Sequence, residues 1–247
     1  MNPKTKKLIF TALGAGTLTL CLRLLLYRVG FDEKNILSSS HPLHLTCLAI
    51  TAFIALFLFF SIRKQDGCDN IKADFSDDPF CRCCMVAAGC LMAFRSIGLT
   101  RETDTLLALF RAGLSLAAVF SMVVCALAPA KLRTLHSLCR GIITTFFALD
   151  MLCRYRGWSG NPQLPDYVFQ IFACVLLSLC SYHRLAFDVG LGKRRVLLWC
   201  SLMALYLSLT CVSGPETRIF YLGGAFWAVS CVCAAELPQE NSKEETP

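Results

Sequence analysis

The sequence predicts an all-α fold, a polytopic transmembrane bundle of about eight helices arranged as four hairpins. Of its 247 residues, 55% are hydrophobic and only 17% are charged, whereas soluble globular proteins carry about 25% charged residues. The charges also gather into short polar islands between apolar runs of about 17 to 23 residues, and a helix needs about 20 residues to cross a bilayer. Eight such runs leave no stretch long enough for a separate soluble domain.

Residues suited to helix ends mark the limits of these runs. Pro42 suits the first turn of a second helix, where its missing N–H would lack a partner anyway. Asp78 can cap a third helix, and the segment 213–216 has the pattern of a capping box before the last one. The predicted helices form one domain, 1–235, and the polar acidic tail, 236–247, is predicted to be disordered. The expected helices cover residues 8–27, 43–62, 80–97, 105–127, 132–153, 166–187, 196–212 and 217–235.

The distribution of basic residues predicts the orientation. With the N-terminus inside, 15 of the 24 Lys and Arg residues fall on the inner side and nine on the outer side. Since an excess of Lys and Arg marks cytoplasmic loops, we expect both termini in the cytoplasm. The same rule accounts for the formal charge of +7, so we do not expect a nucleic-acid partner.

Several ionisable residues fall at a similar depth in the outer third of the predicted bundle. Such residues are expensive in a membrane and need a partner or water. The functional interpretation is a pocket for an anionic ligand or lipid headgroup, because the planar fork of Arg binds carboxylates and phosphates bidentately. The alternative is that each Arg reaches the interface alone. The candidate residues are Arg23, Arg95, Arg111, Asp150 and Arg154.

A second polar set is expected on the inner side, where the fifth and sixth helices form a hairpin. Within it, Arg184 and Asp188 are four residues apart, and this spacing allows pairing on one helical face. Asp150 and Arg154 of the outer set have the same spacing. A proton relay through histidine is one interpretation, and interfacial anchoring of the bundle is the other. The set comprises His136, Arg140, Tyr182, His183, Arg184 and Asp188.

No pattern in the sequence predicts a metal, a cofactor or a catalytic centre. His41 and His44 supply two possible metal ligands where a site needs three or four. Most of the 16 cysteines lie in apolar runs, where a thiol acts as a small hydrophobic group. The densest group, at 81–84, allows soft-metal binding or redox sensing, but adjacent positions on a helix point in different directions.

One region resembles uncharacterised polytopic membrane proteins of anaerobic Firmicutes. The resemblance rests on residues 154–166, on Tyr182-His183-Arg184 and on 187–195, with a weaker match at 31–34 and 41–44. The family has no assigned activity. The resemblance implies a bacterial plasma membrane, and it emphasises the polar residues at both ends of the fifth and sixth helices.

Three hypotheses for function remain open. The first is a small transporter or ligand-binding protein, in contact with the lipid bilayer, whose site accepts a small anion near the outer leaflet. The second is a non-catalytic scaffold or sensor component that acts through partner helices, either of another membrane protein or of a second copy. The third, an intramembrane enzyme, requires His136 or His183 beside a Cys, Ser or Asp of another helix, and the sequence favours a non-enzymatic protein.

Overall fold

The computed structural model describes residues 3–29, 41–63, 79–100, 106–128, 132–158, 164–214 and 217–235. Within these ranges the chain forms eight α-helices and one short 3-10 helix, η1. Each α-helix is long and apolar enough to cross a membrane, which confirms the predicted fold class. The elements are α1 (Pro3–Val29), α2 (Pro42–Arg63), α3 (Pro79–Thr100), α4 (Leu106–Leu127), α5 (Arg133–Trp158), α6 (Leu164–Asp188), α7 (Arg194–Thr210), η1 (Cys211–Ser213) and α8 (Arg218–Ala235).

The helix limits differ from the expected ones mainly at the ends of α1 and α5. α1 begins at Pro3 and α5 continues to Trp158, because charged residues at a membrane interface can still be helical although hydropathy excludes them. α2 begins at Pro42, as the sequence predicts. The expected cap at 78, half of the expected capping box and the acidic tail lie outside the described residues.

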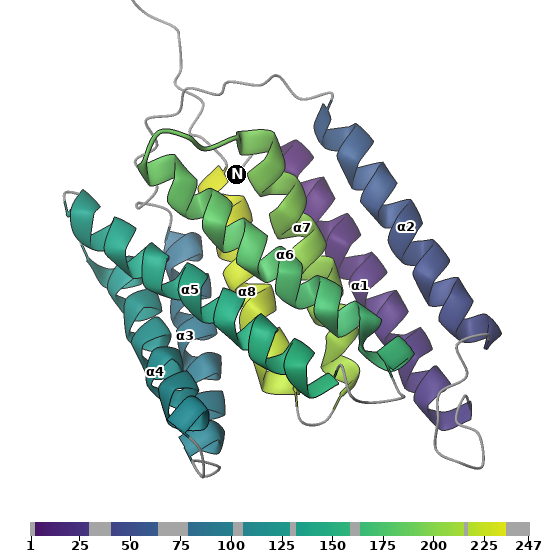
Figure 1. Cartoon of the computed structure of the whole chain (residues 1–247). Helices are drawn as coiled ribbons and strands as arrows, with labels where there is room; N and C mark the ends of the chain where they lie inside the picture. Colours follow the sequence, from purple (N-terminus) through teal and green to yellow (C-terminus); the bar gives the residue numbers. More distant parts are fainter. Residues whose placement is uncertain are drawn as a thin grey trace, which may run out of the picture.

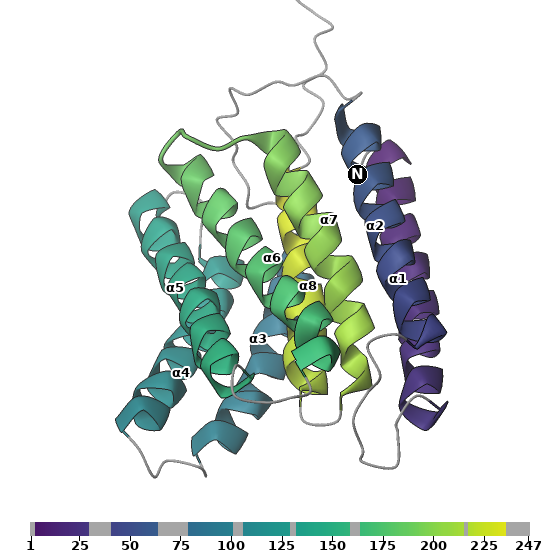
Figure 2. The same ribbon diagram turned by 45° about the vertical axis from the view of Figure 1, so that its right-hand side comes forward.

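The four expected hairpins are present as packed pairs: α1 with α2, α3 with α4, α5 with α6, and α7 with α8. α8 also packs against α3 and α6, and α7 against α1, α2 and α6, so these two helices form the centre of the bundle (Figures 1 and 2). We call the end at which α1, α3, α5 and α7 begin the terminal end, and the opposite end the turn end.

Burial follows this arrangement. α7 and α8 are buried over most of their apolar length, whereas the apolar stretch of α2 is mostly exposed. Side chains as large as Phe53, Phe57 and Phe60 are exposed on α2. An apolar surface of this kind would be anomalous in a soluble monomer, and it is the surface that a lipid-facing helix presents.

Small residues bring the central helices close together. An added Cβ at Gly16 of α1 would lie 3.1 Å from the Cβ of Leu209 on α7, and one at Gly224 of α8 would lie 2.8 Å from a methyl group of Leu177 on α6. Such close approach supplies the van der Waals contact that holds membrane helices together where lipid removes the hydrophobic driving force.

The end of α6 is fixed by a glycine at a positive φ. Gly190 has φ +78°, and its N–H donates to the carbonyl of Phe187 while the N–H of Leu191 donates to the carbonyl of Ala186. These two bonds form a Schellman motif, which satisfies the last free carbonyls of a helix. The following short loop therefore turns the chain sharply into α7.

Candidate functional site

Three arginines from three helices converge on the carboxylate of Asp150. Nε and Nη2 of Arg111, on α4, donate to Oδ1 at 2.8 and 2.5 Å. Nη2 of Arg95, on α3, reaches the same oxygen at 3.4 Å, and Nε of Arg154 donates to Oδ2 at 2.6 Å. We call these four residues the arginine cluster. It lies toward the turn end of the bundle.

Helix geometry explains how the sequence builds this cluster. Asp150 and Arg154 are four residues apart on α5 and share one helical face. Arg95 comes late in α3 and Arg111 early in α4, so an antiparallel pair places them at a similar depth. Because α4 packs against both α3 and α5, the two arginines can meet the carboxylate. The structure thus brings together four of the five residues expected in the outer set.

The ring of Phe220, at the start of α8, packs against two guanidinium groups of the cluster. The guanidinium carbon of Arg95 lies 4.4 Å from its centroid, and that of Arg154 lies 4.3 Å from it. Cation–π contacts of this kind strengthen when they are removed from water. Sequence reasoning did not find Phe220, because one Phe among 18 carries no signal of such a role.

The three arginines of the cluster carry more positive charge than the carboxylate of Asp150 neutralises. Three guanidinium groups face one carboxylate, a formal excess of +2 among the described residues. The side chain of Asp150 is fully buried, and those of Arg154, Arg95 and Arg111 are 6, 12 and 24% exposed. Inserting a single Arg at the centre of a membrane helix costs about 2.5–3.5 kcal/mol on insertion scales. The excess positive charge therefore calls for a partner that offsets this cost.

Two buried guanidinium nitrogens of the cluster remain without an acceptor. Nε of Arg95 and Nη2 of Arg154 have no hydrogen-bond partner among the described residues. Buried donors in native proteins are nearly always satisfied by protein, water or ligand. The arrangement therefore presents two unsatisfied N–H donors within a positively charged site.

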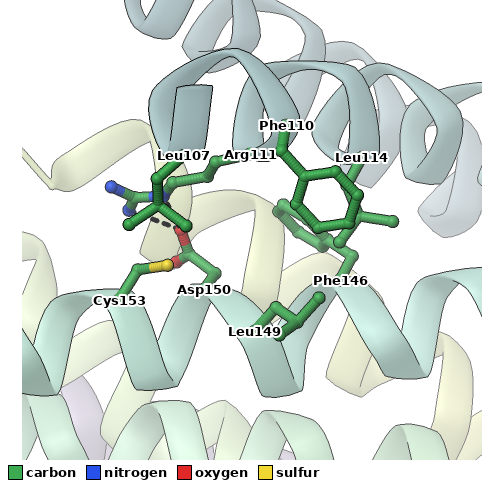
Figure 3. A pocket seen from close by; sticks show the side chains of 8 residues that line it. All are labelled: Leu107, Phe110, Arg111, Leu114, Phe146, Leu149, Asp150 and Cys153. Carbon is green, nitrogen blue, oxygen red and sulfur yellow. Dashed lines mark hydrogen bonds and ion pairs between the residues drawn. The ribbon is translucent and has the colours of Figure 1, made fainter. Parts of the chain in front are cut away.

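A small cavity adjoins the cluster between α4 and α5. Its volume is about 50 Å³, more than the about 30 Å³ that one water occupies in the liquid. Figure 3 shows Arg111 and Asp150 joined on one side of it, with Phe110, Leu114 and Phe146 on the other. The apolar walls belong to helices with lipid-facing surfaces, and the charged groups stand at one edge.

Arg23 is not brought into contact with Asp150 in the described structure, so the expectation that all five outer residues converge is wrong for this residue. Its guanidinium carbon lies 4.9 Å from the ring centroid of Phe169 on α6, and Nη2 donates to the hydroxyl of Tyr27 at 2.8 Å. α1 packs against α7 and α2 rather than against α3, α4 or α5. The position of Arg23 along α1 therefore did not determine the side of the bundle on which it lies.

The inner set divides into an ion pair with a buried histidine one turn away, a pair of adjacent aromatic side chains and one buried arginine. Asp188 pairs with Nη1 of Arg140 on α5, not with Arg184 of its own helix as the spacing suggested. His136, one turn from Arg140, is buried. Tyr182 is exposed, and the half-buried ring of His183 contacts it edge to face at 5.4 Å, which fits interfacial anchoring.

Arg184 is the most buried residue of the inner set, with 1% of its surface exposed. Its Nη1 donates to Oγ of Ser230 at 3.0 Å and contacts Sγ of Cys231 at 3.6 Å. Its guanidinium carbon lies 4.9 Å from the ring centroid of Trp227, and Nη2 lies 3.6 Å from Sδ of Met85. These partners belong to α8 and α3, and none of them is a carboxylate.

Chemically, the described residues offer charge and hydrogen-bond donors rather than a metal site. They contain no group of three His, Cys, Asp or Glu side chains that could hold a metal ion. Cys81 and Cys84 are buried while Cys83 is exposed, so the expected divergence of the thiols in this segment is observed. No protein-family model matches the chain, and searches of curated proteins and of solved structures find no match.

Proposed function

We propose that this integral membrane protein binds a small anionic group at the arginine cluster. The observation that carries the proposal is the pair of buried donors, Nε of Arg95 and Nη2 of Arg154, which lack acceptors among the described residues. An anion would accept from both and offset the charge that Asp150 leaves uncompensated. A cavity of about 50 Å³ adjoins the other two members of the cluster, Arg111 and Asp150, although Arg95 and Arg154 do not line it.

The excess of two charges favours a doubly charged oxyanion. Hydrogen phosphate, a dicarboxylate or the phosphomonoester headgroup of a lipid would each neutralise this excess. Arg binds the oxygens of carboxylate and phosphate groups through two parallel N–H donors. Arg111 is the most exposed of the three arginines, so it is the residue that an arriving anion meets first.

We also propose that the protein resides in a bacterial plasma membrane with both termini in the cytoplasm, which directs the turn end and the arginine cluster toward the outer leaflet. The basis is the excess of Lys and Arg on the predicted inner side. Reporter fusions at the C-terminus test it: alkaline phosphatase should be inactive there and a fluorescent protein should fluoresce. Active phosphatase would reverse the orientation.

Binding can be measured as stabilisation. A ligand that binds only the folded state stabilises it by about 2.7 kcal/mol at 100 times its Kd. The protein in phosphatidylcholine nanodiscs should melt at a higher temperature as inorganic phosphate or succinate is added, but not with chloride at matched ionic strength. Nanodiscs containing phosphatidic acid form a third arm, because stabilisation confined to that arm assigns the anionic group to a lipid.

A matched pair of variants locates the effect. Arg154 is buried in the cluster, whereas Arg156, two residues later, is exposed. Arg154→Gln should abolish the stabilisation, and Arg156→Gln should leave it unchanged. If phosphate, succinate and phosphatidic acid all fail to stabilise the wild-type protein, or if both variants respond equally, the proposed binding function is wrong.

The rival function is a scaffold or sensor component that acts through partner helices. One observation favours it: an added Cβ at Gly113 of α4 or at Gly141 of α5 would meet open space, so these positions would admit the close approach of another helix. The rival predicts that Gly113→Leu weakens association in the membrane, measured by energy transfer between labelled copies or by co-purification, while Arg154→Gln does not.

A further inference from the structure

A second buried guanidinium stands on the opposite side of the bundle core from the arginine cluster. The hydrogen-bond partners of Arg184 on α6 include no carboxylate, and its Nε lacks a hydrogen-bond partner among the described residues. No carboxylate of the described chain pairs with it, unlike Arg140, which pairs with Asp188. Arg184 therefore shares one property with the cluster, a buried guanidinium N–H that has no acceptor among the described residues.

A column of three aromatic rings connects the two positions. The ring of Phe220, which packs against Arg95 and Arg154, lies 6.1 Å from the ring of Phe147, centroid to centroid. The ring centroid of Phe147 in turn lies 6.5 Å from that of Trp227, whose ring contacts the guanidinium group of Arg184. Phe220 and Trp227 are seven residues apart on α8, about 10 Å along the helix at a rise of 1.5 Å per residue.

All three rings are buried, with 1% exposure each. Phe147 belongs to α5, whereas Phe220 and Trp227 belong to α8, which runs through the centre of the bundle (Figures 1 and 2). The column therefore closes the route between the two positively charged positions with apolar groups. An anion could pass only if Phe147 moved or if the helices shifted, so the column has the properties of a barrier between two sites.

We propose that the protein translocates the anion, with the arginine cluster as its first station, Arg184 as its second, and the aromatic column of Phe147, Phe220 and Trp227 as the barrier between them. This inference rests on the proposed anion binding and adds a path across the membrane. At the second station the anion would accept from the guanidinium of Arg184, including its unused Nε. The lack of a carboxylate there leaves the charge of Arg184 available to the anion.

The competing interpretation is that Arg184 only fastens α6 to α8 and α3 through its contacts. Two substitutions separate these roles. Arg184→Met keeps an unbranched side chain in the core and removes the charge, whereas Arg184→Lys keeps the charge and loses the fork of donors. A purely packing role predicts that Met is tolerated at least as well as Lys, and a station predicts the reverse order for transport.

The experiment is uptake of radiolabelled phosphate, or of succinate if that anion gives the larger stabilisation, into proteoliposomes. Wild-type protein should exceed protein-free liposomes. Arg184→Met should reduce uptake at least tenfold while the anion still raises the melting temperature, which shows an intact fold and an intact first station. Arg184→Lys should retain part of the uptake. Arg195→Met, at an exposed position near the same end of the bundle, should stay within twofold of wild type.

The barrier is tested with Phe147→Ala, which should raise passive flux at least threefold. The inference is overturned if wild-type protein binds the anion but gives no uptake above empty liposomes, and in that case the binding function stands. It is also overturned if Arg184→Met transports normally, or if only phosphatidic acid stabilises the protein. Failure of every anion to stabilise the protein removes both the binding function and the translocation path.

Discussion

Replacing Asp150 by Asn should be among the most destabilising single substitutions in the chain. The carboxylate is fully buried and meets three arginines through four contacts between 2.5 and 3.4 Å. Removing one partner of a buried ion pair typically costs about 3–5 kcal/mol, because the other charge stays buried. Here three guanidinium groups would be left facing one another, so we expect a loss of at least about 3 kcal/mol.

The assay is reversible unfolding in mixed micelles, followed by far-ultraviolet circular dichroism. Asp188→Asn is the comparison, because Asp188 has one arginine partner in the described structure and a side chain that is 15% exposed. It should cost less than about 3 kcal/mol, the upper range for a hydrogen bond to a charged group. Adding Arg111→Gln to Asp150→Asn should recover part of the loss, since neighbouring charges couple by about 0.5–3 kcal/mol.

The reasoning would be refuted by a loss below about 1 kcal/mol for Asp150→Asn, the scale of an exposed pair. It would also be refuted if Asp188→Asn proved the more damaging change, or if the double variant were less stable than Asp150→Asn by the full effect of Arg111→Gln alone. Either result would mean that the contacts around Asp150 contribute little to the stability of the fold.

Three further predictions concern packing and the helix end. Gly16→Val should lower the melting temperature clearly, because its first added carbon already meets Leu209 at 3.1 Å, whereas Gly14→Val, with nothing within 4 Å, should leave it nearly unchanged. Tyr206→Phe removes a hydroxyl that joins threonines of α1 and α2, and unfolding measurements should show a loss of about 0.6 kcal/mol per bond, the average for membrane interiors. Gly190→Ala forces a side chain into φ +78° and should cost about 1–2 kcal/mol in the same assay; an unchanged stability would argue against the Schellman turn.

The sequence predicted the helices well because their cause is local. Apolar runs of the right length, and Pro42 at the start of α2, are visible without any tertiary information. Asp150 and Arg154 were also paired correctly, since a spacing of four residues on one helix fixes their relative position. Depth then predicted that Arg95 and Arg111 could join them.

The rest could not be predicted because depth says nothing about which side of the bundle a residue occupies. Arg23 was expected at the same depth, but it belongs to α1, which packs on α7. Arg184 and Asp188 have the right spacing, but Arg140 of α5 takes the carboxylate, and helical side chains lean toward the helix N-terminus, which directs Arg184 into the core. The role of Phe220 depends on tertiary packing, which places α8 beside Arg95 of α3 and Arg154 of α5.

The arginine cluster also constrains how the chain is made. Arg95 and Arg111 leave the ribosome before Asp150, so α3 and α4 carry two unmatched charges until α5 arrives. The most apolar stretch of α5 has a mean hydropathy of only 1.2, against 2.0 for α4, so α5 is a weak candidate for insertion on its own. The three helices are therefore expected to enter the lipid as one cooperative group, with the carboxylate of Asp150 completing an insertion that α3 and α4 begin.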